Sequence, residues 1–139
     1  MRLELRNLIG LTALMGQTPS MTQDALCSLH PYFQVNAGQL DAFKKLCERF
    51  MEQTKTEPGC QYYGFSFNND QVHCREGYRD AEALLAHLKN VEATIGESLK
   101  IATLIRLEVH GPAGELDKLR GPMADLKPQF FTLEYGFRN

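Results

Sequence analysis

The sequence predicts an α+β fold of the ferredoxin-like, split βαβ type, in which helices cover one face of an antiparallel sheet. Hydrophobic residues recur at every second position in some stretches and at every third or fourth position in others, as expected of strands and helices respectively. These stretches run in the order strand, helix, strand, strand, helix, strand, with a further helix and strand at the end. The chain has 139 residues, 43% of them hydrophobic, which is enough for one globular domain. We expect this domain at residues 23–139, after an N-terminal extension at residues 1–22.

The first predicted elements are a helix in the extension and the first strand of the domain. An apolar run favours a helix at residues 3–15, and Pro19 prevents its continuation. The run is too short to span a bilayer and lacks a clear signal-peptide cleavage site, so we expect a cytoplasmic protein. Residues 24–35 alternate as a strand, with Phe33 on its apolar face. Pro31 in this strand cannot donate a backbone hydrogen bond, which indicates an edge strand or a bulge.

A long helix is predicted after this strand. Asn36, three residues before Gln39, resembles a capping box, which is typical of a helix N-terminus. One apolar stripe follows at helical spacing, and Pro58-Gly59 ends the element. The stripe comprises Leu40, Phe43, Leu46, Cys47, Phe50 and Met51.

Two strands at residues 60–67 and 71–78 form a predicted hairpin, because Asn69-Asp70 between them is typical of a tight turn. The register that this turn sets pairs Tyr63 with Glu76 and Phe65 with Cys74. One face of the hairpin is then apolar except for one carboxylate and two phenols, as expected of a cavity wall. This face comprises Tyr63, Phe65, Phe67, Val72, Cys74, Glu76 and Tyr78.

The hydrophobic period changes from that of a strand to that of a helix at Asp80, a residue type favoured as a helix N-cap. Leu84 belongs to the apolar stripe of the helix that follows, and His87 lies about one turn later at the margin of this stripe. Glu76 and Tyr78 at the strand end are therefore expected to face one cleft together with His87.

The last part of the chain is predicted to contain further helices and strands. A second helical segment begins after a break at Asn90, and a strand follows at residues 102–110. A short helix is expected near residues 113–119 and a last strand at residues 130–137. The strand at 102–110 places Ile105, Leu107 and Val109 on one side.

Composition and motifs disfavour several classes of function. The net charge is −2 with dispersed Lys and Arg, so we expect neither a nucleic-acid nor a membrane partner. The four cysteines show no CxxC spacing and the four histidines no HExxH motif, so we expect no metal site and no disulfide framework. No P-loop, GxGxxG or GxSxG motif occurs in the required context, and we expect no cofactor.

His87 and Glu76 each allow two interpretations. A near-neutral imidazole beside a carboxylate is suited to act as a general base. Alternatively the pair ties the helix to the sheet, because a carboxylate on an apolar face has to be paired. Tyr63 and Tyr78 are likewise either core aromatics with satisfied hydroxyls or proton donors. The candidate catalytic residues are His87, Glu76 and Tyr78, and the candidate ligand-binding residues are Phe33, Tyr63, Phe65, Cys74 and Leu84.

Four stretches of the chain follow one another in a familiar order and spacing. They are HPYFQVNAGQLDAF at 30–43, EPGCQYYGF at 57–65, CREGYRDAEALLAHL at 74–88 and FFTLEYGF at 130–137. The chain thereby resembles the antibiotic biosynthesis monooxygenase-like (ABM) family of dimeric α+β barrel proteins. The resemblance implies a homodimer with a large, mainly apolar interface, in which two sheets close a barrel and cover Phe130, Tyr135 and Phe137. It also implies metal-free and flavin-free oxidation of a phenol or quinol, whose deprotonated form itself reduces oxygen in an apolar cavity.

The sequence differs from this family pattern in three respects. The chain has no Trp, and Tyr78 stands where a Trp is common. Glu97 and Pro31 stand in place of the histidine and asparagine of the haem-degrading branch, which disfavours that activity. Two hypotheses remain. One is a cofactor-independent monooxygenase for a small aromatic or quinone-like molecule, and the other is a non-catalytic dimer that binds a small apolar ligand or has a structural role.

Overall fold

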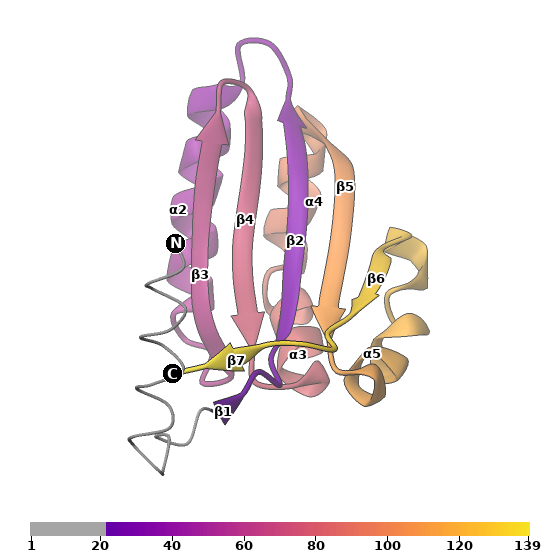
Figure 1. Ribbon diagram of the computed structural model, residues 1–139. Helices are drawn as coiled ribbons and strands as arrows, with labels where there is room; N and C mark the ends of the chain where they lie inside the picture. Colours follow the sequence, from indigo (N-terminus) through magenta and orange to yellow (C-terminus); the bar gives the residue numbers. More distant parts are fainter. Residues whose placement is uncertain (1–21) are drawn as a thin grey trace, which may run out of the picture.

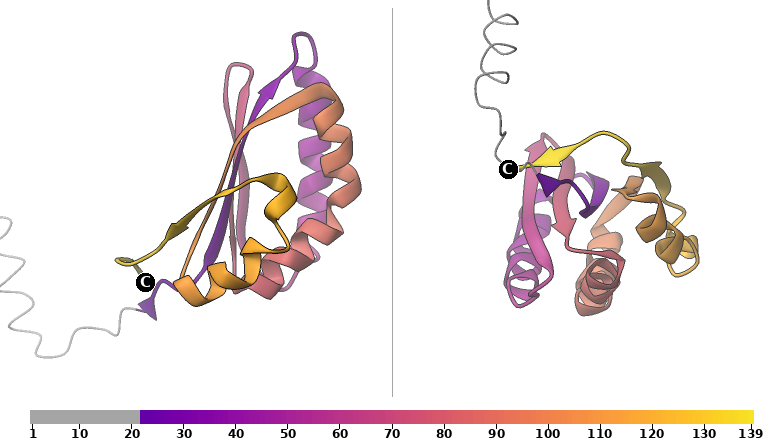
Figure 2. Two further views of the ribbon diagram at one scale, coloured as in Figure 1. Left: turned by 90° about the vertical axis from the view of Figure 1, so that its right-hand side faces the viewer. Right: turned by 60° about the horizontal axis from the view of Figure 1, so that its bottom comes forward.

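The computed structural model describes residues 22–139, so the helix predicted at residues 3–15 lies outside the described residues. The strands are β1 (Thr22–Gln23), β2 (Cys27–Val35), β3 (Cys60–Asn68), β4 (Gln71–Tyr78), β5 (Ala102–Gly111), β6 (Gln129–Thr132) and β7 (Phe137–Arg138). The helices are α2 (Leu40–Thr54), α3 (Ala81–Asn90), α4 (Glu92–Ile101) and α5 (Ala113–Arg120), with a 3-10 turn η1 (Ala124–Leu126). Five strands form a sheet in the order β3-β4-β2-β5-β6, and α2, α3 and α4 cover one of its faces (Figures 1 and 2). The predicted α+β class and the predicted order of elements are confirmed.

The last predicted strand is wrong in two respects. Residues 130–137 do not form one strand, because β6 ends at Thr132 and β7 begins at Phe137. β6 runs parallel to β5, so the sheet is mixed rather than antiparallel. The crossover through α5 and η1 explains this direction, since a parallel neighbour requires a connection that returns the chain to the start of the preceding strand. β7 leaves the sheet and pairs with β1 across its end (Figure 2).

β2 lies between β4 and β5 in the middle of the sheet, so the edge position inferred from Pro31 is wrong. A bulge does lie nearby, because the register between β2 and β5 shifts between Tyr32 and Phe33. The extra residue is Ile105, which has no partner in this register. The bulge leaves Ile105 exposed on the outer face, whereas the sequence predicted that it shares the inner face with Leu107. A single inserted residue is sufficient to reverse the alternation of a strand.

The two helix starts proposed from the sequence have different outcomes. α3 begins directly after Asp80, whose side chain accepts a hydrogen bond from the Ala83 N–H at 2.8 Å, as predicted. α2 begins at Leu40, and its N-cap makes no side-chain hydrogen bond. Asn36 instead begins a turn, in which its carbonyl accepts a hydrogen bond from the Gln39 N–H at 3.0 Å. The capping box at Asn36 is therefore wrong.

The β3–β4 hairpin has the predicted register. Tyr63 pairs with Glu76 and Phe65 pairs with Cys74. Asn69 in the turn has a φ of 53°, a left-handed conformation that Asn adopts more readily than most residues. The inner face of the hairpin consequently presents the predicted phenols and carboxylate to the helices.

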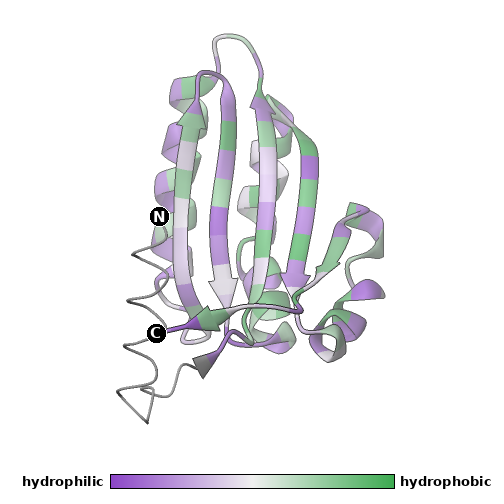
Figure 3. Cartoon of the chain, viewed as in Figure 1, coloured by the Kyte–Doolittle hydropathy of each residue, from purple (hydrophilic) through white to green (hydrophobic). Residues whose placement is uncertain are grey.

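The outer face of the sheet, which faces the viewer in Figure 3, carries a group of three histidine rings. His30 lies at its centre, with its ring centroid 5.8 Å from that of His73 and 4.6 Å from that of His110. Phe130 packs against the core, whereas Tyr135 beyond it is 92% exposed. The C-terminal aromatic residues therefore divide between the core and the surface.

Candidate active site

A cavity of about 70 Å³ lies between the inner face of the sheet and helices α3 and α4. It is lined by Leu29, Pro31, Phe33, Phe50, Tyr63, Phe65, Cys74, Glu76, His87, Leu88, Val91, Ile95, Leu99, Leu104, Leu107 and Leu126. Apart from Glu76 and His87, the lining is apolar or aromatic. Pockets that enclose drug-sized ligands measure several hundred Å³, so this cavity encloses a narrow group of a ligand rather than a large ring system.

The structure brings most of the predicted site residues to this cavity. Four of the five candidate ligand-binding residues line it, namely Phe33, Tyr63, Phe65 and Cys74. Leu84 does not, because it lies in the hydrophobic core beside Tyr78. Tyr78 is fully buried and reaches Glu76 from within this core, so it too does not line the cavity.

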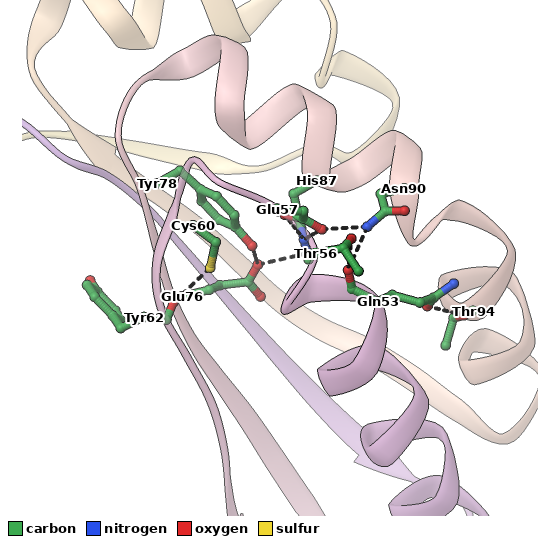
Figure 4. A network of polar contacts seen from close by, with 10 residues as sticks. All are labelled: Gln53, Thr56, Glu57, Cys60, Tyr62, Glu76, Tyr78, His87, Asn90 and Thr94. Atoms are coloured by element: carbon green, nitrogen blue, oxygen red, sulfur yellow. Dashed lines mark hydrogen bonds and ion pairs between the residues drawn. The ribbon is translucent and has the colours of Figure 1, made fainter.

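Five polar side chains form a chain of contacts behind the cavity wall (Figure 4). The Tyr78 hydroxyl donates to Glu76 Oε1 at 2.5 Å, and His87 Nε2 lies 3.2 Å from the same oxygen. On the other side of the ring, His87 Nδ1 lies 2.9 and 3.0 Å from the two carboxylate oxygens of Glu57. Asn90 Nδ2 donates to Glu57 Oε2 at 2.8 Å. The imidazole is thus held between two carboxylates.

Three elements position this network. Glu76 and Tyr78 lie two residues apart on β4 and therefore share the inner face of the sheet. α3 begins at Ala81, which places His87 nearly two turns into the helix that packs over this strand end. Glu57 lies in the turn between α2 and β3, where Asn90 also donates to the Gln53 carbonyl at 3.0 Å and ties the ends of α2 and α3 together.

The charge state of His87 follows from its two neighbours. Glu76 and His87 are each only 2% exposed. Burial by itself lowers the pKa of His87, but the hydrogen bonds and charges of Glu76 and Glu57 outweigh it and raise the pKa above its ordinary value of 6.5. Each ring nitrogen faces a carboxylate, and only an imidazolium can donate from both nitrogens. This geometry favours the imidazolium form of His87, whose two N–H groups would both donate, over a ring with a free lone pair that acts as the general base.

The phenols and the thiol at this site are held in their neutral forms. Burial raises the pKa of Tyr78 far above its ordinary value, and the charge of Glu76 raises it further. Burial and Glu76 act in the same way on the pKa of Tyr63 and on that of Cys74. The site therefore combines one carboxylate at the cavity, Glu76, with a cation and neutral hydroxyl groups around it. Among residues 22–139, no group of three or more His, Cys, Asp and Glu side chains is arranged to hold a metal ion.

Glu57 was not identified as a site residue from the sequence. It belongs to the stretch EPGCQYYGF, but no periodic pattern connects it with His87, which lies 30 residues further along the chain. The sequence signal that could have indicated Glu57 is its position directly before Pro58-Gly59, because a turn at these residues brings the Glu57 carboxylate back toward the sheet.

The comparisons with known proteins identify the family of this chain. The family model described as antibiotic biosynthesis monooxygenase matches residues 28–94, a region that contains Glu57, Glu76 and His87. The crystal structure of MupZ from Pseudomonas fluorescens is 52% identical, covers 84% of this chain and 96% of MupZ, and superposes with a TM-score of 0.80. The chain belongs to the antibiotic biosynthesis monooxygenase family. The predicted family resemblance is confirmed.

More distant ABM-like structures share the fold alone. Rv0793 from Mycobacterium tuberculosis is 19% identical, with a TM-score of 0.56 over 63% of this chain and 95% of its own. A Nitrosomonas europaea protein provisionally assigned as an antibiotic biosynthesis monooxygenase is 16% identical, with a TM-score of 0.59 over 66% of this chain and 93% of its own. No curated protein matches this ABM chain. None of the helices in residues 22–139 is long and apolar enough to cross a bilayer.

Proposed function

We propose that this ABM protein is a cofactor-independent enzyme whose reaction begins with a proton transfer to Glu76 from a small, mainly apolar molecule. One observation carries this proposal: Glu76 is a buried carboxylate at the wall of an apolar cavity, with His87 at 3.2 Å as its counter-ion. A carboxylate without a cation would not remain charged at this depth. His87 therefore supplies the positive charge that a carboxylate needs at this depth, and the Tyr78 hydroxyl donates to the same Glu76 oxygen that His87 faces.

For a small aromatic or quinone-like substrate, this proton transfer starts an oxygenation. The O–H bond of a phenol or quinol breaks, its proton moves to Glu76, and the electron-rich anion reduces molecular oxygen directly. One oxygen atom forms a C–O bond with the substrate carbon in place of a C–H bond, and the other takes up two protons and leaves as water, so that the substrate supplies all the electrons. The nearby imidazolium of His87 stabilises the anion in a cavity from which water is excluded. His87 acts in this scheme as a fixed positive charge rather than as the base.

A second function is favoured by the proton donors at the same site. The cationic His87 and the neutral Tyr63 and Tyr78 surround the carboxylate, whereas the chain has no Trp. An acid and a base at one cavity are sufficient for reactions that need no oxygen, such as an isomerisation or the addition of water.

We further propose that the protein is a homodimer, as in dimeric α+β barrels. The exposed aromatic side chains Phe131, Tyr135 and Phe137 support this arrangement, because a partner subunit would cover them. The outer face of the sheet would contribute histidines and charged groups to the interface, which should bury more than about 1,000 Å² in total.

The test is a substrate panel of phenols, quinols and non-aromatic analogues, with oxygen consumption and product mass followed together. Glu76→Gln should lower turnover by about two orders of magnitude or more, because it removes the proton acceptor and keeps the side-chain shape. Glu52→Gln, an exposed change on α2, is the matched control. Turnover with oxygen uptake supports oxygenation, and turnover without it supports the second function. Saturable binding with no turnover of any compound would refute both and support a non-catalytic ligand-binding protein.

A further inference from the structure

A second cleft, of about 270 Å³, lies at the end of α2 and the start of β3. It is lined by Met51, Thr54, Lys55, Glu57, Cys60, Gln61, Tyr62 and Tyr63. Within the described part of the chain, Tyr63 is the one residue that also lines the first cavity. Glu57 connects this second cleft to the polar network, because its carboxylate lies 2.9 Å from His87 Nδ1.

A buried hydroxyl indicates what this second cleft contains. Thr54 is only 3% exposed, and its Oγ1 makes no hydrogen bond of ordinary geometry to residues 22–139, although it lies close enough to the Tyr63 hydroxyl to lower the pKa of Tyr63 slightly against the effect of burial. Buried polar groups of this kind are normally satisfied by ordered water. The cleft lies directly beside Thr54 and is large enough for several water molecules. Water in the cleft would therefore contact both Thr54 and Glu57.

The first cavity offers no comparable route for water. Leucine is the commonest residue in its wall, and the two leucines that are most exposed are Leu99 and Leu126. An apolar ligand bound there would exclude solvent from Glu76 and His87. A proton that enters or leaves this buried pair during a reaction then needs another way to bulk water.

We propose that the second cleft is a proton port and that Glu57 relays protons between His87 and bulk water. The Nδ1–H bond of His87 breaks as an O–H bond forms on the Glu57 carboxylate, and Glu57 then passes this proton to water in the cleft. The reverse proton transfers, from water to Glu57 and from Glu57 to Nδ1, restore the imidazolium, and no electron transfer is involved. The exposure of the side chains increases along this route, from 3% for His87 to 11% for Glu57. Glu57 is a positioning residue, because it acts on the reacting atoms through His87.

The other groups that face His87 do not offer this route. Glu76 and Tyr78 on β4 lie on the Nε2 side of the ring, at the first cavity and in the core. Tyr63 on β3 borders both spaces, but burial raises its pKa so far that it does not ionise. Lys55 lines the second cleft without a contact to the ring. Among the described residues, Glu57 is the carboxylate that both hydrogen-bonds to His87 and borders the second cleft.

The role of the proton port in catalysis rests on the proposed function. Proton exchange through the port, however, can be measured without a substrate. Two matched variants each place a large side chain at one opening: Gln61→Trp at the second cleft and Leu126→Trp at the first cavity. Both positions are exposed, so the folded state should tolerate the changes. The observable is the exchange of the His87 ring protons with water, measured by NMR on protein labelled with ¹⁵N-histidine.

Gln61→Trp should slow this exchange about tenfold, because the proton then has to wait for a local opening, whereas Leu126→Trp should leave it unchanged. Glu57→Gln should also slow it, since the amide keeps the shape and removes the proton acceptor, with Glu52→Gln as the control. Three results would refute the proton port: slower exchange of the His87 ring protons in Leu126→Trp alone, equally slow exchange in both Trp variants, or unchanged exchange in both. A protein that turns over no substrate but shows the expected exchange pattern would refute the proposed function and leave the port intact.

Discussion

Replacing His87 by glutamine should destabilise the protein by an amount that decreases as the pH rises. The wild-type ring contacts the carboxylates of Glu76 and Glu57 at 3.2 and 2.9 Å and is almost fully buried. Removing one partner of a buried ion pair costs about 3–5 kcal/mol. A glutamine amide can donate to one of the two carboxylates, so we expect the lower end, about 3 kcal/mol, at pH 6. At ~4 °C per kcal/mol for a domain of this size, the melting temperature should fall by about 12 °C.

The pH dependence distinguishes an imidazolium from a neutral histidine. The folded-state pKa of His87 is raised above 6.5, so its protonation stabilises the folded state fully below pH 6.5. This contribution is lost as the pH rises through the raised pKa. The difference in unfolding free energy between wild type and His87→Gln should therefore shrink as the pH rises above 6.5, as measured by urea denaturation at a series of pH values.

His30→Gln provides a control of opposite sign. Burial lowers the pKa of His30, and the neighbouring His110 and His73 lower it further. Protonation of this residue therefore opposes folding, and wild type should gain stability relative to His30→Gln as the pH rises toward neutrality. The difference in unfolding free energy between wild type and His87→Gln could instead stay constant or grow from pH 6 to 9. Either result would refute the conclusion that His87 is an imidazolium held between two carboxylates.

The remaining predictions concern packing, assembly and the extension. Gly59→Ala should cost about 1–3 kcal/mol in thermal denaturation, because the added Cβ would lie 2.5 Å from that of Ala83, whereas Gly96→Ala on α4 meets no atom and should gain about 0.5–1 kcal/mol. Equal effects of the two changes would contradict the close approach at Gly59. Sedimentation at micromolar concentration should give a dimer, and a monomer would exclude the barrel arrangement. Deletion of residues 1–20 should leave cooperative unfolding unchanged, and its loss would show that the extension belongs to the core.

The parts of the fold that could be predicted depend on local signals. The Asn69-Asp70 turn and the alternation on both sides of it fix the hairpin register within a few residues of sequence. Asp80 marks the start of α3 equally well, since it is the N-cap residue and its side chain accepts a hydrogen bond from the Ala83 N–H. His87 was recognised for the same reason: helical spacing from this cap places it over the strand that carries Glu76.

The parts that could not be predicted depend on contacts between distant segments. The bulge at Ile105 exists only in the pairing of β5 with β2, so the alternation of β5 alone gave the wrong face for this residue. The parallel direction of β6 follows from a crossover whose path the sequence does not encode locally. Glu57 reaches His87 only through the tertiary packing of the α2–β3 turn against α3. The sequence therefore indicates only one of the two carboxylates that raise the pKa of His87.

Two irregularities of the sheet adjoin the first cavity. Pro31, which lines this cavity, removes one N–H group from the central strand β2, and β5 carries its extra residue at Ile105, close by in the neighbouring strand. Regular strand ladders resist local deformation because every backbone group is paired. In this part of the sheet, Pro31 provides no backbone N–H donor and Ile105 has no partner residue in β2. The curvature of the sheet can therefore change here without breaking a continuous series of backbone hydrogen bonds. For protein engineering, residues 30–32 and 104–107 are consequently the place to enlarge or reshape the pocket for new ligands while the polar groups on α3 and β4 remain in position.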